Sequence, residues 1–242
     1  VLLERVLPSW GEFFRTTLHM EGAYCAVYLD PRPETAGRLL ESLEPIDLPG
    51  TMRFIARSVR GELELTRGNV RTAALIQRVS LRYAGNWRSI LGSGSQWELY
   101  ILSMCLVTDV ELSPDDAVEL DARAVRARAT SLLREILSDP APRQRDIPTL
   151  MAFAAAVGLS AVAAEDAGPD RRAVGAELVA TALAVGTNQT CRLLSHDYLR
   201  SRTERLDARA LAQAEERIRS LDRGGLVVHA ADLAGRLAGE VG

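Results

Sequence analysis

The sequence predicts an all-α fold of about 10–11 helices, stacked as antiparallel hairpins in a tetratricopeptide-like superhelix. Three observations support this prediction. Aromatic residues make up 5% of a chain that is 47% hydrophobic, so the core must consist mainly of Ala, Leu and Val, which suits packed helices better than sheets. Apolar residues recur with a helical period between caps and breaks, and no segment shows the alternation of a strand. Residues 1–242 are expected to form a single helical-repeat domain, with degenerate repeat hairpins in 1–86 and a larger helical region in 87–242.

The first helices are marked by a capping box and by proline. Ser9 and Glu12 have the S-x-x-E spacing that starts a helix, and an amphipathic segment follows as far as Leu29. Pro33 fits the first turn of a second helix, which is expected to stop before Pro45.

The clearest supersecondary signal is a helical hairpin. Met52–Thr66 and Val70–Tyr83 have helical periodicity, and residues 67–69 between them predict a tight turn. Three small residues have spacings that resemble those of a tetratricopeptide repeat: Gly61, Gly68 and Ala73. The bulky early positions of that repeat are absent, so a degenerate array is expected.

Caps also mark the helices that follow. Ser95 is expected to start a helix that runs to Val110, and the acidic run after Ser113 starts the longest helix, which ends near Leu137. Further along, Asp170 and Asp207 are expected to cap two helices, with a short helix at about 190–198 between them. A last helix is expected at Val228–Val241, after a Gly-Gly break.

We expect the rest of the chain to be organised around the stretch Arg145–Asp166, RDIPTLMAFAAAVGLSAVAAED. It has no charged residue between Asp146 and Glu165, yet it is too rich in alanine for a membrane span. Asp146 can cap the helix, and Pro148 fits its first turn. The stretch therefore predicts a core helix, and no membrane association is expected.

The basic residues exclude several enzyme classes. All 29 of them are arginine, which rules out a Schiff-base lysine, a P-loop lysine and a kinase-type lysine. The net charge of −3 gives no global electrostatic reason for nucleic-acid binding. We expect no direct nucleic-acid binding and no cofactor.

The cysteines indicate a reducing compartment. Cys25, Cys105 and Cys191 are widely spaced, which favours free thiols in the cytoplasm. No signal peptide is expected, because charge and proline interrupt the opening residues. The first residue is valine, which fits either a fragment or a GTG start codon written as Val.

Two short motifs resemble catalytic metal sites, but a purely structural role explains each of them more simply. Asp115, Asp116 and Glu119 spell DDxxE, the pattern of a terpene-synthase metal site, but acidic residues in a first turn also complement the helix dipole. His196-Asp197 resembles the central dipeptide of an HD-type phosphohydrolase, which needs further His and Asp ligands that this chain does not place nearby. We therefore expect no catalytic residues and no metal ligands.

Arginines on two consecutive helices are the candidate interaction patch: Arg53, Arg57 and Arg60 on the first, and Arg71, Arg78 and Arg82 on the second. Each set shares a helix face by its spacing. The patch could contact an acidic partner, although arginines of this kind are also common on a solvated face.

Two stretches resemble the C-terminal helical region of actinobacterial transcriptional regulators of the AfsR/SARP type, which contain a bacterial transcriptional activator domain. Residues 145–154, RDIPTLMAFA, resemble that family's Asp-Leu-Pro opening of an Ala-rich helix. Residues 175–188, GAELVATALAVGTN, resemble its helix that ends in a Gly–aromatic–Asn turn, with Thr187 in place of the aromatic residue. The resemblance implies a regulatory or interaction domain, without the DNA-binding and ATPase domains of such regulators.

The sequence therefore predicts a non-enzymatic domain that regulates transcription by binding a protein or another domain of the same regulator. Two alternatives remain open. One is a small-molecule sensor with a pocket beside the central helix. The other is an all-α diphosphate-dependent enzyme that uses Asp115, Asp116 and Glu119.

Overall fold

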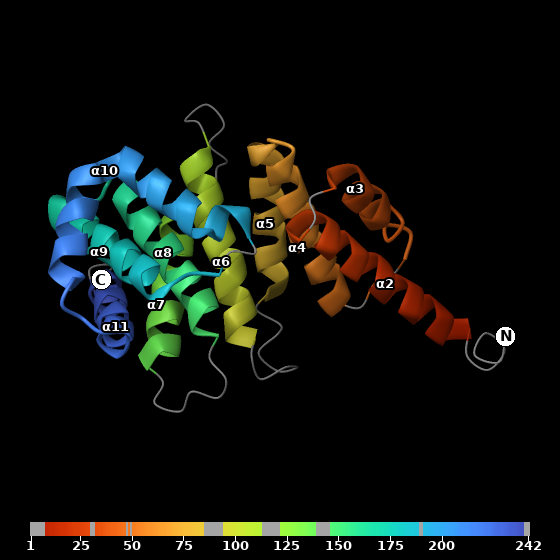
Figure 1. The fold of residues 1–242 in the computed structure, drawn as a ribbon. Coiled ribbons are helices and arrows are strands. Elements are labelled where there is room, and N and C mark those ends of the chain that lie inside the picture. The colour runs from red at the N-terminus through yellow and green to blue at the C-terminus, as the bar shows by residue number, and fades with distance from the viewer. Residues whose placement is uncertain are drawn as a thin grey trace. The chain divides into compact units, whose positions relative to one another are not determined.

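A computed structural model of the chain describes residues 8–29, 32–46, 48, 50–84, 94–112, 122–138, 146–188 and 191–239. Within these ranges the chain is all-α, with ten α-helices, one short 3-10 helix and no strand (Figure 1). This confirms the predicted fold class. The contacts divide the chain into two compact units, Val1–Tyr83 (unit 1) and Ala84–Gly242 (unit 2). The subdivision expected after residue 86 lies outside the described ranges.

Unit 1 contains α2 (Pro8–Tyr28), α3 (Pro33–Glu41), α4 (Gly50–Thr66) and α5 (Val70–Ala84). Proline begins both α2 and α3, at positions where its missing N–H leaves no helical hydrogen bond unmade. α2 packs against α3 and α4, and α3 packs against α4. Their buried apolar side chains form one cluster: Met20, Ala23, Ala26, Ala36, Leu40, Leu43, Leu48, Val59 and Leu63.

α4 and α5 form the predicted hairpin, and the small residues have distinct roles in it. Gly68 adopts φ +82°, the left-handed conformation that closes a helix end. The Asn69 N–H then donates to the Glu64 carbonyl oxygen at 2.8 Å. Gly61 lies where α5 comes close, because a Cβ at that position would stand 2.5 Å from Nε2 of Gln77. Ala73 is fully buried.

Unit 2 is organised around α8. Its elements are α6 (Gly94–Glu111), α7 (Ala122–Ser138), α8 (Ile147–Ala163), α9 (Pro169–Val185), η3 (Arg192–Leu194), α10 (His196–Ile218) and α11 (Arg223–Gly239). α8 contacts α6, α7, α9, α10 and η3. Every residue of α8 from Leu150 to Val162 is buried, which confirms the predicted core helix. None of the helices in the described ranges combines the length and the apolar character that crossing a membrane requires.

The α8–α9 pair is packed at backbone distance through two glycines. A Cβ on Gly158 would lie 2.5 Å from the carbonyl oxygen of Gly175, and a Cβ on Gly175 would lie 2.7 Å from the carbonyl oxygen of Gly158. Real Cβ atoms do not come this close to a backbone oxygen. Glycine at both positions is therefore what allows the two helix axes to approach so closely.

The start of α8 is fixed by hydrogen bonds that also hold the end of α9. Asp146 caps α8 as predicted, because Oδ1 accepts from the Thr149 N–H at 3.3 Å and Oδ2 accepts from the Thr149 hydroxyl at 2.6 Å. Beyond α9, the Asn188 N–H donates to the Pro148 carbonyl oxygen at 3.0 Å. Nδ2 of Asn188 donates to Oγ1 of Thr149 at 2.9 Å.

The expected starts of the later helices are partly wrong. Gly168 is the N-cap of α9, and Asp170 lies in the first turn, where it complements the helix dipole without capping. Asp207 does cap a helical segment, since its Oδ1 accepts from the Ala210 N–H at 2.9 Å. However, α10 runs on both sides of Asp207, which forms a kink at φ −158° and ψ 79°.

α11 begins earlier than the expected Val228. Asp222 precedes it, and Oδ1 of Asp222 accepts from the Gly225 N–H at 2.7 Å. The capping carboxylate compensates for the low helix propensity of the two glycines in the first turn. The Gly-Gly pair therefore lies inside the helix rather than before it.

Candidate functional site

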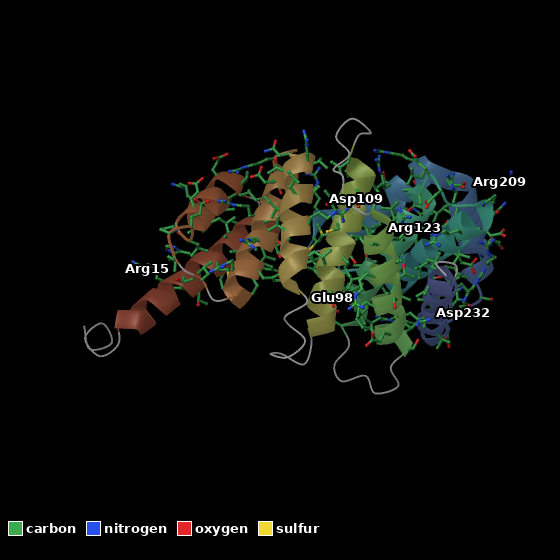
Figure 2. The ribbon with its side chains drawn as sticks, turned by 180° about the vertical axis from the view of Figure 1, so that it is seen from behind. Arg15, Glu98, Asp109, Arg123, Arg209 and Asp232 are labelled. Carbon is green, nitrogen blue, oxygen red and sulfur yellow. The ribbon has the colours of Figure 1, made fainter. Side chains whose placement is uncertain are left out.

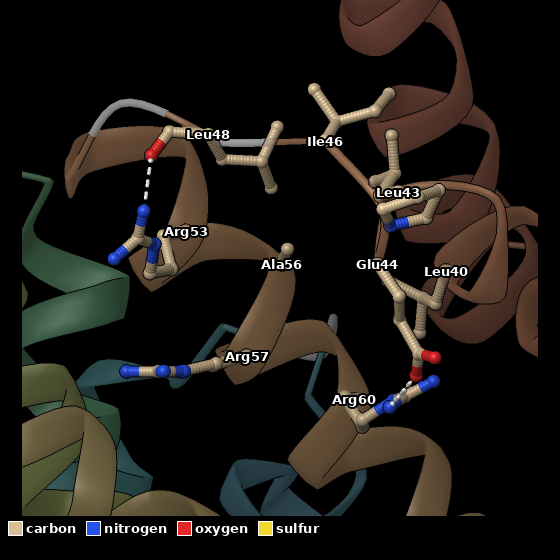
Figure 3. A pocket seen from close by; sticks show the side chains of 10 residues that line it. Leu40, Leu43, Glu44, Ile46, Leu48, Arg53, Ala56, Arg57 and Arg60 are labelled. Carbon is tan, nitrogen blue, oxygen red and sulfur yellow. Dashed lines mark hydrogen bonds and ion pairs between the residues drawn. The ribbon is translucent and has the colours of Figure 1, made fainter.

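A pocket of about 500 Å³ opens on unit 1 between the end of α3, the segment after it and α4 (Figure 3). Ligand pockets commonly have volumes of about 300–1,000 Å³. The lining residues are Leu40, Leu43, Glu44, Pro45, Ile46, Leu48, Arg53, Ala56, Arg57 and Arg60. The wall from α3, residues 43–46 and residue 48 is mainly aliphatic, whereas α4 contributes three arginines and one alanine.

Helix geometry places the three arginines in a row. Residues 53, 57 and 60 recur at the i, i+4 and i+7 positions of α4, so the row extends about 10 Å along one helix face. Figure 3 shows Arg53 and Arg60 toward opposite ends of this face, with Ala56 between them. The pocket thus combines an apolar wall with three arginine side chains, of which Arg60 is directed toward Glu44 and Arg57 extends away from it (Figure 3). Each guanidinium group has five N–H donors.

Two of these arginines hold the rim of the pocket together. Nη2 of Arg53 donates to the Leu48 carbonyl oxygen at 3.0 Å, which ties the start of α4 to the segment before it. Nη1 of Arg60 pairs with Oε1 of Glu44 at 2.5 Å. The Arg60 side chain is 35% exposed and that of Glu44 is 59% exposed, so this ion pair lies in water and stabilises the fold only weakly.

The remaining arginines of the predicted patch are not part of this pocket. Arg71 is exposed on α5. Arg78 is 8% exposed, so the expectation that it adds to a surface patch is wrong, because packing buries this part of the α5 face. Arg82 lies on α5, and its side chain is outside the described residues.

The other candidate motifs do not form a site in the part of the chain that is described. Asp115, Asp116 and Glu119 fall outside the described ranges. His196 and Asp197 occupy the first turn of α10, and Nδ1 of His19 contacts the Ser42 hydroxyl in unit 1. Among the described residues, no group of three or more His, Cys, Asp or Glu side chains could hold a metal ion.

A shielded carboxylate in unit 2 joins three helices. Glu177 on α9 has a 12% exposed side chain, and its Oε2 accepts from Nε of Arg217 on α10 at 2.7 Å. Its Oε1 contacts Nε2 of His229 on α11 at 2.8 Å. Both carboxylate oxygens are thus used, and no side chain with a nucleophilic hydroxyl or thiol takes part in these contacts. The arrangement stabilises helix packing.

A second polar cluster joins α10 to α6. The Tyr198 hydroxyl donates to Oε1 of Glu111 at 2.6 Å, and Nη2 of Arg202 donates to the Val110 carbonyl oxygen at 2.7 Å. Burial, and then the hydrogen bond to Glu111, raise the pKa of Tyr198 far above its ordinary value. The phenol therefore stays protonated and acts as a hydrogen-bond donor, not as a base.

Glu98 and Arg128 form the corresponding tie between α6 and α7. Nε and Nη2 of Arg128 donate to the two carboxylate oxygens of Glu98 at 2.8 and 3.1 Å. This hydrogen bonding raises the pKa of Arg128. Glu98 is buried and Asp109 is half-buried, whereas Arg123, Arg209 and Asp232 are exposed (Figure 2). The exposed charges lie on separate helices and form no comparable site.

Sequence reasoning identified the arginine face of the pocket and missed its apolar wall. Leu40 lies on α3, but Leu43, Ile46 and Leu48 follow the helix in a segment with no period to reveal their partners. Glu44 was also missed. The sequence feature that could have indicated Glu44 is its position directly before Pro45, as an acidic residue in a segment that otherwise contributes apolar side chains to the pocket.

Comparison of the chain with protein-family models, with curated proteins and with solved structures finds no match. The function proposed below is therefore inferred from the residues of this chain.

Proposed function

We propose that the chain is a non-enzymatic helical domain that binds a protein partner, or another domain of its own polypeptide, and regulates transcription through that contact. The pocket of unit 1 is the observation that carries this proposal. It is lined by aliphatic side chains and three arginines, a combination that suits protein recognition, where arginine is enriched.

The resemblance to AfsR/SARP-type regulators provides further support. The first stretch, residues 145–154, includes the start of α8, and the second, residues 175–188, ends just after α9. These two helices pack against each other through Gly158 and Gly175. Asn188, the last residue of the second stretch, donates to Pro148 and Thr149 at the start of the first helix. The two stretches are thus parts of one packed element, as related motifs would be. The cytoplasm is the proposed location.

Small-molecule sensing is a second candidate, favoured by the volume of the pocket. The pocket lies in unit 1 and is lined by α3 and α4, whereas the sequence placed such a site beside the central helix α8. A sensor would respond to a metabolite in the absence of any protein partner. A shift of the unfolding temperature with a metabolite, in the purified chain, would favour this candidate.

The regulatory proposal is tested by disrupting the gene in the source organism and measuring transcript abundance. We expect a defined set of transcripts to change and to recover when the wild-type gene is restored. An immunoblot of the same cells gives the native mass, and a band well above 26.4 kDa would show that the chain is one part of a larger regulator. Transcript levels that stay the same in the disrupted strain would contradict the proposal.

A further inference from the structure

We propose that the α3–α4 pocket binds an acidic, aliphatic peptide segment of the partner, and that Glu44 occupies the place of a peptide carboxylate when the pocket is empty. This inference rests on the proposed function and names the chemistry of its partner. Its starting point is the pocket lining, which has an aliphatic wall and three arginines of α4, one of which, Arg60, is directed toward Glu44 (Figure 3).

The aliphatic wall defines the apolar part of the ligand. Leu40, Leu43 and Leu48 belong to the buried cluster of unit 1, and Ile46, which is only partly buried, packs against this cluster and also lines the pocket. Leu, Ile or Val side chains of a peptide would extend this cluster and remove further apolar surface from water.

The α4 face defines the charged part of the ligand. The arginine row along α4 matches the spacing at which a helical or extended peptide presents successive Asp or Glu side chains. Arginine binds carboxylates with paired N–H donors, so one guanidinium can accept a new carboxylate while keeping an existing contact. Arg53 keeps its contact with the Leu48 carbonyl oxygen in this arrangement.

The Glu44–Arg60 pair shows the contact that the peptide would make. Oε1 of Glu44 lies 2.5 Å from Nη1 of Arg60 at the pocket. Because more than half of the Glu44 side chain is exposed, it can rotate away into water at low cost. A peptide carboxylate can then replace Glu44 on Arg60, and Glu44 acts as an internal competitor for the site.

The open rim favours a peptide over a small molecule. Small-molecule sites typically bury about 70–90% of the ligand surface. Here Pro45 and Glu44 are exposed and Arg60 is partly exposed at the rim, which leaves one side of any occupant in water. A peptide tolerates this because its backbone and remaining side chains stay hydrated.

The Glu44–Arg60 ion pair allows the proposed competition to be tested, because Arg60→Gln and Glu44→Gln both break the same contact. If the pair were only structural, the two variants would behave alike. Under the proposal they change binding in opposite directions. The probe is a fluorescein-labelled synthetic peptide of Asp and Glu interspersed with Leu and Ile, measured by fluorescence anisotropy with the purified full chain.

We expect Arg60→Gln to weaken binding of the acidic peptide about tenfold, a typical loss for a charge-assisted contact. Glu44→Gln should tighten binding several-fold. Arg71→Gln, on the exposed surface of α5, is the matched control and should leave binding unchanged. Circular dichroism checks that each variant is folded, and methyl resonances of Leu40, Leu43 and Ile46 should shift when the peptide is added to the wild-type chain.

Several results would overturn the inference. These are no binding of the acidic peptide, equal binding of a peptide with Asn and Gln in place of Asp and Glu, and changes of the same sign in both variants. Binding of decanoate in preference to the peptide would assign the pocket to a small molecule. None of these results alters the transcript response to gene disruption, so failure of this inference and failure of the regulatory proposal are distinguishable.

Discussion

Gly158→Ala is expected to lower the free energy of unfolding by about 3 kcal/mol, at the upper end of the usual cost of overpacking a core. The new Cβ would stand 2.5 Å from the carbonyl oxygen of Gly175 and 2.9 Å from Cγ2 of Val179. Relief of the contact with Gly175 requires the α8 and α9 backbones to separate, because the obstructing atom belongs to the main chain. Guanidinium denaturation followed by circular dichroism measures the change.

The sign of this effect is informative. Alanine has the higher helix propensity by about 1 kcal/mol, so Gly→Ala inside a helix ordinarily stabilises. Gly239→Ala is the matched control, because it lies in α11 with no atom within 4 Å of its added Cβ, and it should be neutral or stabilising. If Gly158→Ala behaved like Gly239→Ala, the close approach of α8 and α9 would be wrong.

Leu63→Ala is expected to destabilise the chain by about 3 kcal/mol, within the range of about 2–5 for truncating a buried leucine. Leu63 on α4 is 1% exposed and belongs to the cluster that supports the pocket wall. Loss of its side chain leaves a cavity in the cluster that also contains Leu40 and Leu43, so affinity for the acidic peptide should fall as well. Denaturation and hydrogen exchange of the amides in α2, α3 and α4 measure the loss of stability, and fluorescence anisotropy measures the loss of affinity.

Leu18→Ala provides the control for this prediction. Leu18 lies on α2 and is 69% exposed, so its truncation should change the free energy of unfolding by less than about 0.5 kcal/mol, as is usual for surface positions. A loss below about 1 kcal/mol for Leu63→Ala, with unchanged exchange in α3 and α4, would mean that Leu63 is not part of a packed core.

Local signals predicted the elements of the fold well where the deciding interaction was local. Asp146 and Asp207 were recognised as caps because a carboxylate needs only the N–H three residues later. The same rule failed at Asp170, because Gly168 and Pro169 already begin the helix. It also missed Asp222, because the two glycines after it indicated a break, although the cap and the packing of α11 keep them helical.

The pocket could be predicted only in part for the same physical reason. Helical spacing shows that residues 53, 57 and 60 share a face, and likewise 71 and 78, but it does not show which face is buried. Burial of Arg78 depends on tertiary packing, which helical spacing does not show. The contact between Leu48 and Arg53 is close in the chain, but it involves a segment with no periodic pattern. The Glu44–Arg60 pair spans sixteen positions and leaves no periodic signal.

We propose that the chain regulates transcription through the α3–α4 pocket. The most direct test restores the disrupted gene with Arg60→Gln or with Arg71→Gln and measures the affected transcripts, with immunoblots to confirm equal protein levels. We expect Arg71→Gln to restore the transcripts and Arg60→Gln to leave them near the level of the disrupted strain. Full restoration by both variants would contradict the claim, because the gene would then act on transcription without this pocket.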